Sequence, residues 1–158
     1  MVDWWCDLAC SDSAASLEVL DELRDRFGDA IEVRLRHFPL TEHVWAVAAA
    51  QCHVAVSAQG RGEAYAAHAL ATIDTIEGPA DYVDLAEFLG ADSDEVAAAL
   101  FDGRHASEVR DDHDAGRAIG VVGTPTFVVD GLLIDASGTL DGALDALAAR
   151  IDRARSAR

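Results

Sequence analysis

A single proline constrains the folding of this chain more than any other residue. Pro125 stands directly before 126–129, a run of β-branched and aromatic residues that is typical of a strand. Proline has no N–H to give to a sheet, so a proline at the start of a strand indicates that the backbone requires it there. The usual reason is a tight turn, often with a cis peptide bond. The sequence therefore predicts a cis Thr124–Pro125 bond that leads into a strand.

The second informative feature is a cysteine near the start of the chain. Cys10 lies between an apolar segment, 2–8, which predicts a buried strand, and 13–27, which has helical periodicity. Unpaired N–H groups and the helix dipole at that junction favour the thiolate, which is the reactive form of cysteine. Asp12 opposes this effect because a nearby like charge disfavours the anion. Cys10 is therefore a candidate nucleophile, and the alternative is a small buried thiol that only fills space.

The remaining segments give an α/β order. Alternation of apolar and polar residues predicts a strand at 31–35, and two further strands are predicted at 126–129 and 132–134 around an Asp-Gly hairpin turn. A last helix is predicted at 140–153. The region between the second and third strands is helical throughout, with helices predicted at 43–58, 61–76, 80–89, 93–101 and 104–118. The order is β-α-β, a helical block, and then β-β-α.

Composition and charge narrow the classes of partner. The chain has 158 residues, enough for one domain with a sizeable core. Its net charge of −17 repels nucleic acid and anionic membranes, so neither is an expected partner. No basic leader precedes the first strand and no apolar stretch reaches the ~18 residues of a membrane span, so a cytoplasmic protein is expected. The three cysteines, an odd number, argue against a disulfide framework.

Three segments carry a resemblance to a known family. They are 2–10, with the apolar strand and Cys10; 36–40, Arg-His-Phe-Pro-Leu; and 122–131, with Gly-Thr-Pro-Thr-Phe. The chain resembles the DsbA family of thioredoxin-fold thiol–disulfide oxidoreductases, particularly its cytoplasmic FrnE-like branch. The resemblance implies a thioredoxin fold with an all-helical insertion between strands two and three. The thioredoxin-like domain would comprise 1–41 and 119–158, and the inserted helical subdomain would comprise 42–118.

The resemblance also implies site residues, with one departure. Family members that exchange disulfides carry Cys-x-x-Cys, whereas this chain has Cys10-Ser11-Asp12-Ser13. Cys10 takes the place of the leading cysteine and Ser13 replaces the resolving one, while Thr124 and Pro125 would bind the thiol or peptide substrate. Ser13 can donate a hydrogen bond to the sulfur or cap the helix, but it cannot attack a mixed disulfide. The implied activity is therefore a monothiol one that needs an outside thiol to turn over.

The other residues of interest have structural interpretations. Cys6 would lie ~13 Å from Cys10 along an extended chain, whereas a disulfide needs Cα atoms within about 7 Å, so no bridge is expected. Cys52 lies among small apolar residues of a predicted helix and is expected to be packing. The acidic and histidine run 111–114 could hold a cation, but a solvated helical face is the prediction, and no metal site is expected elsewhere.

Two other functions remain open. One is a glutathione-dependent isomerase or transferase of the 2-hydroxychromene-2-carboxylate isomerase type, in which Ser13 would polarise a bound thiol. The other is a degenerate thioredoxin-fold module that only binds a peptide or partner helix. The expected partner is a small thiol or a thiol- or disulfide-bearing protein, and the expected state is a monomer or homodimer. No tightly bound cofactor is expected, and glutathione or another low-molecular-weight thiol is the candidate co-substrate.

Overall fold

A four-stranded mixed sheet forms the centre of the molecule. The computed structural model describes residues 1–156 and orders the strands β2-β1-β3-β4. β1 (Val2–Cys6) runs parallel to β2 (Val33–His37) and antiparallel to β3 (Thr126–Val129), which forms a hairpin with β4 (Leu132–Asp135). The predicted α/β class and the predicted element order are confirmed.

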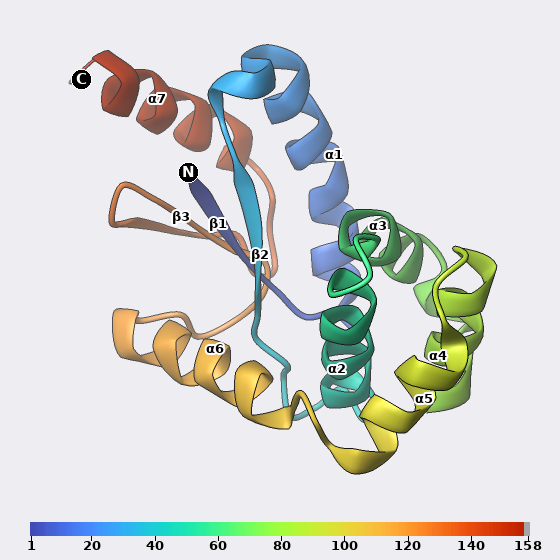
Figure 1. Cartoon of the computed structure of the whole chain (residues 1–158). Helices are drawn as coiled ribbons and strands as arrows, with labels where there is room; N and C mark the ends of the chain where they lie inside the picture. The colour runs from blue at the N-terminus through green and yellow to red at the C-terminus, as the bar shows by residue number, and fades with distance from the viewer. Residues whose placement is uncertain (157–158) are drawn as a thin grey trace.

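Helices cover both faces of the sheet and one side of it. α1 (Ser11–Phe27) and α7 (Ala143–Ser156) lie on one face and α6 (Ala106–Ile119) lies on the other (Figure 1). Four further helices, all between β2 and α6 in the chain, pack together beside the sheet: α2 (Ala46–Ser57), α3 (Gly62–Ala71), α4 (Pro79–Phe88) and α5 (Ser93–Asp102). Among residues 1–156, no helix has both the length and the apolar character needed to cross a bilayer.

Several predicted boundaries shift for local reasons. The first strand ends at Cys6 because a turn begins at Asp7, whose carbonyl accepts a hydrogen bond from the Cys10 N–H at 3.1 Å. The helix predicted at 61–76 ends at Ala71 and is followed by a 3₁₀ turn at Ile73–Thr75. The predicted hairpin turn is confirmed, since Asp130 and Gly131 both have positive φ, as a two-residue turn of this kind requires.

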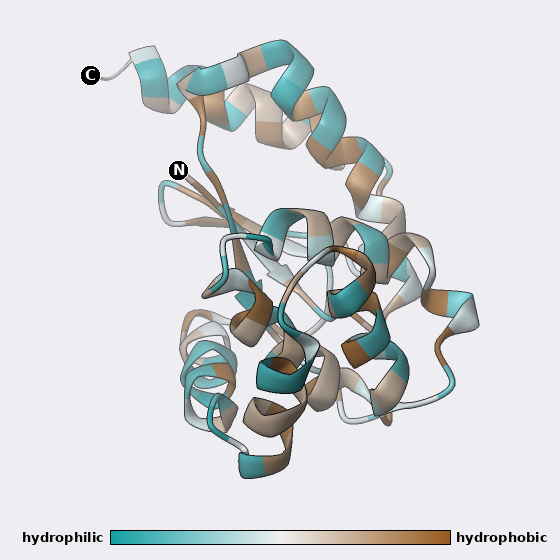
Figure 2. Cartoon of the chain, turned by 45° about the vertical axis from the view of Figure 1, so that its right-hand side comes forward, coloured by the Kyte–Doolittle hydropathy of each residue, from teal (hydrophilic) through white to brown (hydrophobic). Residues whose placement is uncertain are grey.

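Alternation along β1 divides the core between the two faces. One face of β1 carries Val2, Trp4 and Cys6, which belong to the larger of two buried clusters, together with the buried residues of α1 and α7. The other face carries Trp5 and is covered by α6. Teal and brown residues interleave along α1 in Figure 2, as expected for a helix with one buried face. Trp4 and Trp5 are both buried.

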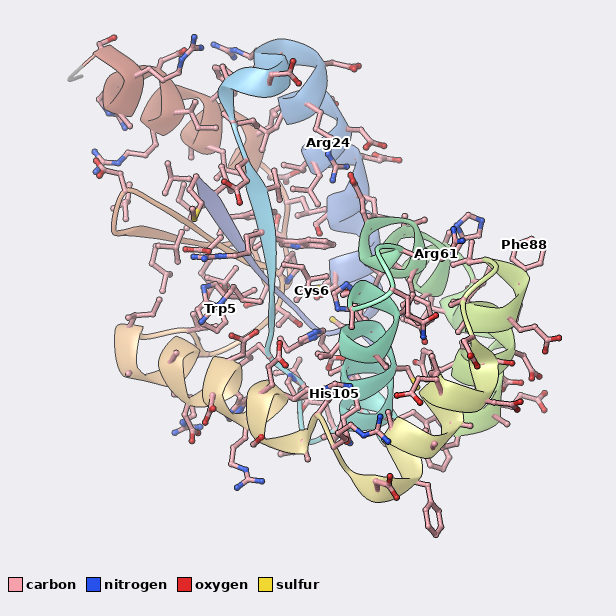
Figure 3. The ribbon with its side chains drawn as sticks, viewed as in Figure 1. Trp5, Cys6, Arg24, Arg61, Phe88 and His105 are labelled. Atoms are coloured by element: carbon pink, nitrogen blue, oxygen red, sulfur yellow. The ribbon has the colours of Figure 1, made fainter. Side chains whose placement is uncertain are left out.

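In the smaller buried cluster, which contains Trp5, α6 approaches the sheet closely at Gly116. A Cβ atom built on Gly116 would lie 2.8 Å from two ring carbons of Trp5 and 3.0 Å from Cδ2 of Phe38. Trp5 lies between the sheet and α6 (Figure 3) and is buried. Its ring packs edge-on against Phe38 at a centroid distance of 6.3 Å. Neither ring has room to retreat, so α6 must carry a glycine here.

We expect Gly116→Ala to destabilise the fold by about 1–3 kcal/mol, even though alanine is the better helix former. Urea denaturation measures the change in the free energy of unfolding. Gly78→Ala is the matched control, because nothing lies within 4 Å of its Cβ position and its φ is extended. An equal loss in both variants would contradict the packing explanation.

Candidate active site

Cys10 occupies the N-terminal end of α1. It is the N-cap residue, with extended backbone angles (φ −106°, ψ 124°), and its carbonyl accepts the N–H of Ala14 at 3.0 Å. Its side chain makes no capping hydrogen bond to the helix. The sulfur is therefore at the positive end of the helix dipole and free for other partners, as the sequence predicted.

The second predicted segment lies beside this sulfur. The Thr124–Pro125 peptide bond is cis, in agreement with the prediction. The Cys10 thiol donates a hydrogen bond to the Thr124 carbonyl oxygen at an Sγ–O distance of 3.7 Å, although the two residues are 114 positions apart. The antiparallel pairing of β1 with β3, in which Trp5 faces Thr126, brings these two segments together. Cys10 and the Thr124–Pro125 segment thus lie side by side, as a candidate site requires.

Ser13 lies under the turn that carries Cys10. Ser13 is fully buried, and its Oγ accepts a hydrogen bond from the Asp7 N–H at 3.3 Å. No hydrogen bond within residues 1–156 joins Ser13 to the Cys10 sulfur. The thiol near Ser13 is instead that of Cys6: burial raises the pKa of Cys6 well above its usual range, and a hydrogen bond from Ser13 partly offsets this.

The three thiols differ in access. Cys10 is 5% exposed, whereas Cys6 and Cys52 are both 0% exposed, and all three are free. Burial raises the pKa of Cys52 to about 11, and this residue lies in the main core as predicted. Cys10 is therefore the least buried of the three thiols, although it too is classed as buried.

The sequence did not indicate the role of Asp7, a buried polar residue in the turn that carries Cys10. Asp7 is 1% exposed, and its carboxylate accepts hydrogen bonds from the Ala9 N–H at 2.8 Å and the Leu40 N–H at 2.9 Å, while its Oδ2 lies 2.7 Å from His43 Nδ1. It thus ties the Cys10 turn to the loop after β2. The available signal was an aspartate that directly follows a buried strand, since a buried carboxylate requires partners.

The interpretation of 111–114 as a solvated face is wrong for two of its residues. Asp112 accepts a hydrogen bond from the His37 N–H at 2.9 Å and forms an ion pair with Arg36, also at 2.9 Å. His113 stacks on Phe38 with ring centroids 4.5 Å apart. Both side chains hold α6 against β2. Within the described residues, no cluster of three or more histidine, cysteine or acidic residues is placed to hold a metal ion.

The fold and this geometry agree with a known family. The family model described as a DSBA-like thioredoxin domain matches residues 1–150 of the chain. The chain belongs to this family. The match covers the whole sheet, the inserted helices and both halves of the site. The chain is therefore a DSBA-like thioredoxin domain, the family that the resemblance in its sequence indicated.

Solved structures show the same fold. A thioredoxin-like oxidoreductase from Silicibacter pomeroyi superposes with a TM-score of 0.78 at 22% identity, over 99% of this chain and 87% of that one. DsbA from Chlamydia trachomatis superposes with a TM-score of 0.79 at 19% identity, over 98% of this chain and 86% of that one. The predicted thioredoxin fold of the DSBA-like domain is therefore confirmed.

A curated relative carries a similar segment within a much longer protein. The Na(+)/H(+) antiporter NhaA 3 of Salinispora tropica is 38% identical over 112 residues, which are 69% of this chain and 17% of that protein. The DSBA-like chain thus spans less than a fifth of that relative.

Proposed function

We propose that this DSBA-like protein exchanges thiols and disulfides through a single nucleophile, Cys10. One observation carries the proposal: the Cys10 sulfur lies at the N-terminus of α1 and beside the Thr124 carbonyl, at 3.7 Å. The helix end favours the thiolate, and the adjacent backbone of Thr124 offers polar groups to an extended substrate. Position 13 carries a hydroxyl where a dithiol site has its second sulfur.

The chemistry proceeds in two balanced steps. The Cys10 thiolate attacks a substrate disulfide RSSR, forms a mixed disulfide Cys10–S–S–R, and releases RS⁻. A second, outside thiolate R′S⁻ then attacks the R sulfur, gives RSSR′, and restores the Cys10 thiolate. Ser13 cannot replace that outside thiol because a hydroxyl does not attack a disulfide. Glutathione or another low-molecular-weight thiol is the proposed co-substrate, with no resident cofactor.

The surroundings suit a peptide or protein disulfide. Exposed apolar side chains adjoin Thr124 and His43 in the chain: Val122 precedes Thr124, and Val44 and Trp45 follow His43, whose ring contacts Asp7. Such residues supply apolar contact to a partner that adds an extended strand at the Thr124–Pro125 segment. We therefore propose a disulfide-bearing protein as the main partner and a small thiol as the recycling one.

The two competing functions have less support. An isomerase that uses Ser13 to polarise a bound thiol needs an accessible hydroxyl, whereas Ser13 is fully buried with its Oγ on the Asp7 N–H. A purely binding module would have no need of a thiol at the helix N-terminus beside the Thr124 carbonyl.

Incubation with oxidised glutathione tests the proposal. We expect a glutathione adduct on Cys10 and none on Cys6 or Cys52, because Cys10 alone of the three has exposed surface. Cys6 and Cys10 both precede Arg24 and share a tryptic peptide, so fragment-ion mass spectrometry must separate them. Cys10→Ser should abolish the adduct, and Cys52→Ala, the matched control, should leave it unchanged. An adduct on Cys52 with none on Cys10 would overturn the proposal.

A further inference from the structure

The edge of the sheet at β2 presents backbone groups that β1 does not pair. β2 is an outermost strand, and no further strand within the described residues pairs with its outer side. The Phe38 N–H donates to the Cys6 carbonyl at 2.9 Å, and alternate residues before Phe38 point their backbone groups to β1 in the same way. Val33 and Leu35 lie between those residues, so their N–H and C=O groups point away from β1. This edge can therefore accept one more strand.

The two halves of this edge differ in what lies beside them. At the C-terminal half, Asp112 of α6 accepts the outward N–H of His37 at 2.9 Å. At the N-terminal half, Val33 and Leu35 line a hollow of about 1150 Å³ between β2, α1 and the start of α3 (Figure 1). A further strand must therefore pair with the segment around Val33 and not with the end at His37.

The sequence of this segment, Ile31-Glu32-Val33-Arg34-Leu35, is complementary to itself. The backbone of Ile31 is extended (φ −125°, ψ 148°), so the segment continues before β2 begins. Its three apolar residues are half-buried and pack on the larger cluster, whereas its two charged residues are exposed. Antiparallel pairing about Val33 sets Ile31 opposite Leu35 on one face and Glu32 opposite Arg34 on the other. Apolar residues thus meet apolar ones and each acid meets a base, which are the favourable cross-strand pairs.

Neighbouring registers of the same pairing are unfavourable. A centre at Glu32 or at Arg34 sets that residue opposite its own copy, which brings like charges together. A centre at Leu35 sets His37 opposite Val33, but the His37 N–H is already bonded to α6. Exposed charges commonly protect a sheet edge from pairing. In the register centred on Val33 the charges instead attract.

We propose that two copies of this chain form a homodimer in which their β2 edges pair antiparallel about Val33. The N–H groups of Val33 and Leu35 then donate to the carbonyls of Val33 and Ile31 of the other copy, and the two sheets become continuous. The Arg34 Nε donates to Asp3 at 2.8 Å, and the side chain is 47% exposed, so its terminal nitrogens can meet Glu32 of the second copy. The inference is independent of the proposed function, because it concerns the sheet edge and not Cys10.

Sedimentation velocity over a range of protein concentrations measures the dimerisation constant. Salt must be present, because each copy carries a net charge of −17 and salt screens their repulsion. Arg34→Glu and Glu32→Arg should each weaken dimerisation about tenfold, since each replaces two opposite-charge pairs with two like-charge pairs. An equimolar mixture of the two variants should associate as the wild type does, because glutamate again meets arginine at both pairs.

Two outcomes of the sedimentation experiment overturn the inference: a wild type that stays monomeric over the whole range, and a mixture that fails to associate. Arg104→Glu is the matched control, because it changes the net charge equally at an ion-paired side chain that is 45% exposed and lies after α5. It should leave the dimerisation constant unchanged. An equal loss in Arg104→Glu would assign the effect to net charge and would also overturn the inference.

A cross-link tests the register directly. Val33 is the position that faces its own copy, at a Cα separation of about 5.5 Å, which lies within the range of a disulfide. In a Cys10→Ser background, Val33→Cys should therefore give a covalent dimer on oxidation. Arg36→Cys should give none, because the residue that faces position 36 in this register is Ala30. Equal cross-linking of both variants, or of neither, contradicts pairing about Val33.

Discussion

Ser13→Cys is expected to convert the proposed monothiol site into a dithiol site that turns over by itself. The replacement puts a second sulfur one helical turn after Cys10, at a buried position of nearly the same volume. The new thiol would attack the Cys10 mixed disulfide within the molecule and release the second product as a thiol. Because an oriented intramolecular attack replaces a collision with an outside thiol, we expect disulfide reduction to accelerate by on the order of 100-fold. Insulin reduction with dithiothreitol measures this rate.

Cys6 must be controlled in that experiment, because its thiol lies near position 13. The same replacement in a Cys6→Ala background should retain the gain, and mass spectrometry should find a disulfide between Cys10 and the introduced thiol in the oxidised protein. Ser13→Ala keeps the small buried side chain without a sulfur and should stay at the wild-type rate. A gain in Ser13→Ala, or none in Ser13→Cys despite a folded protein, would contradict the monothiol interpretation.

The sequence predicted the half of the site that depends on local backbone requirements. Pro125 before a strand and Cys10 before a helix each have a local physical reason, and the β-α-β then β-β-α order places both at the same end of the sheet. The structure places them together, with Cys10 Sγ 3.7 Å from the Thr124 oxygen. Periodicity located the helices well, because each has a continuous buried face.

The part that the sequence did not predict depends on contacts between distant residues of ordinary types. The pairing of Asp7 with His43 spans 36 positions, and that of Asp112 with His37 spans 75. Asp7 has a local signal, because it directly follows a buried strand. No local pattern distinguishes its partner or the other pair from solvated residues, because the helical period gives the buried face but not which loop or strand end packs there. The solvated interpretation of 111–114 was wrong for this reason.

A histidine pair, with His37 buried and His53 half-buried, is responsible for the second large effect, destabilisation by acid. His37 Nε2 and His53 Nδ1 lie 3.0 Å apart in a hydrogen bond that joins β2 to α2. Burial lowers the pKa of His53 to about 4, and burial, with smaller contributions from His53 and Arg36, lowers the pKa of His37 well below its ordinary value. Both rings are therefore neutral in the folded protein at pH values where the unfolded chain binds protons.

Stability must then fall as the pH decreases. In the unfolded chain each ring titrates near 6.5, so the full contribution is present above that pH and is lost progressively toward pH 4. Between pH 7.5 and pH 5 the loss is roughly 2 kcal/mol for each histidine, or roughly 4 kcal/mol for the pair. This is a large share of the ~5–15 kcal/mol that stabilises a typical domain. Urea midpoints measured across this range, which lies above the titration of most carboxylates, should show the loss.

His53→Gln should flatten this dependence by about 2 kcal/mol over the same range, because one of the two titrating rings is absent. It will also lower stability at pH 7.5, since glutamine replaces the imidazole hydrogen bond to His37 imperfectly. The slope of the free energy of unfolding against pH, rather than its absolute value, therefore reports the contribution of the His53 ring. His68→Gln is the matched control on the exposed side of α3, and it should leave the slope unchanged. A wild-type slope that persists in His53→Gln would mean that carboxylates, and not the histidine pair, cause the acid sensitivity.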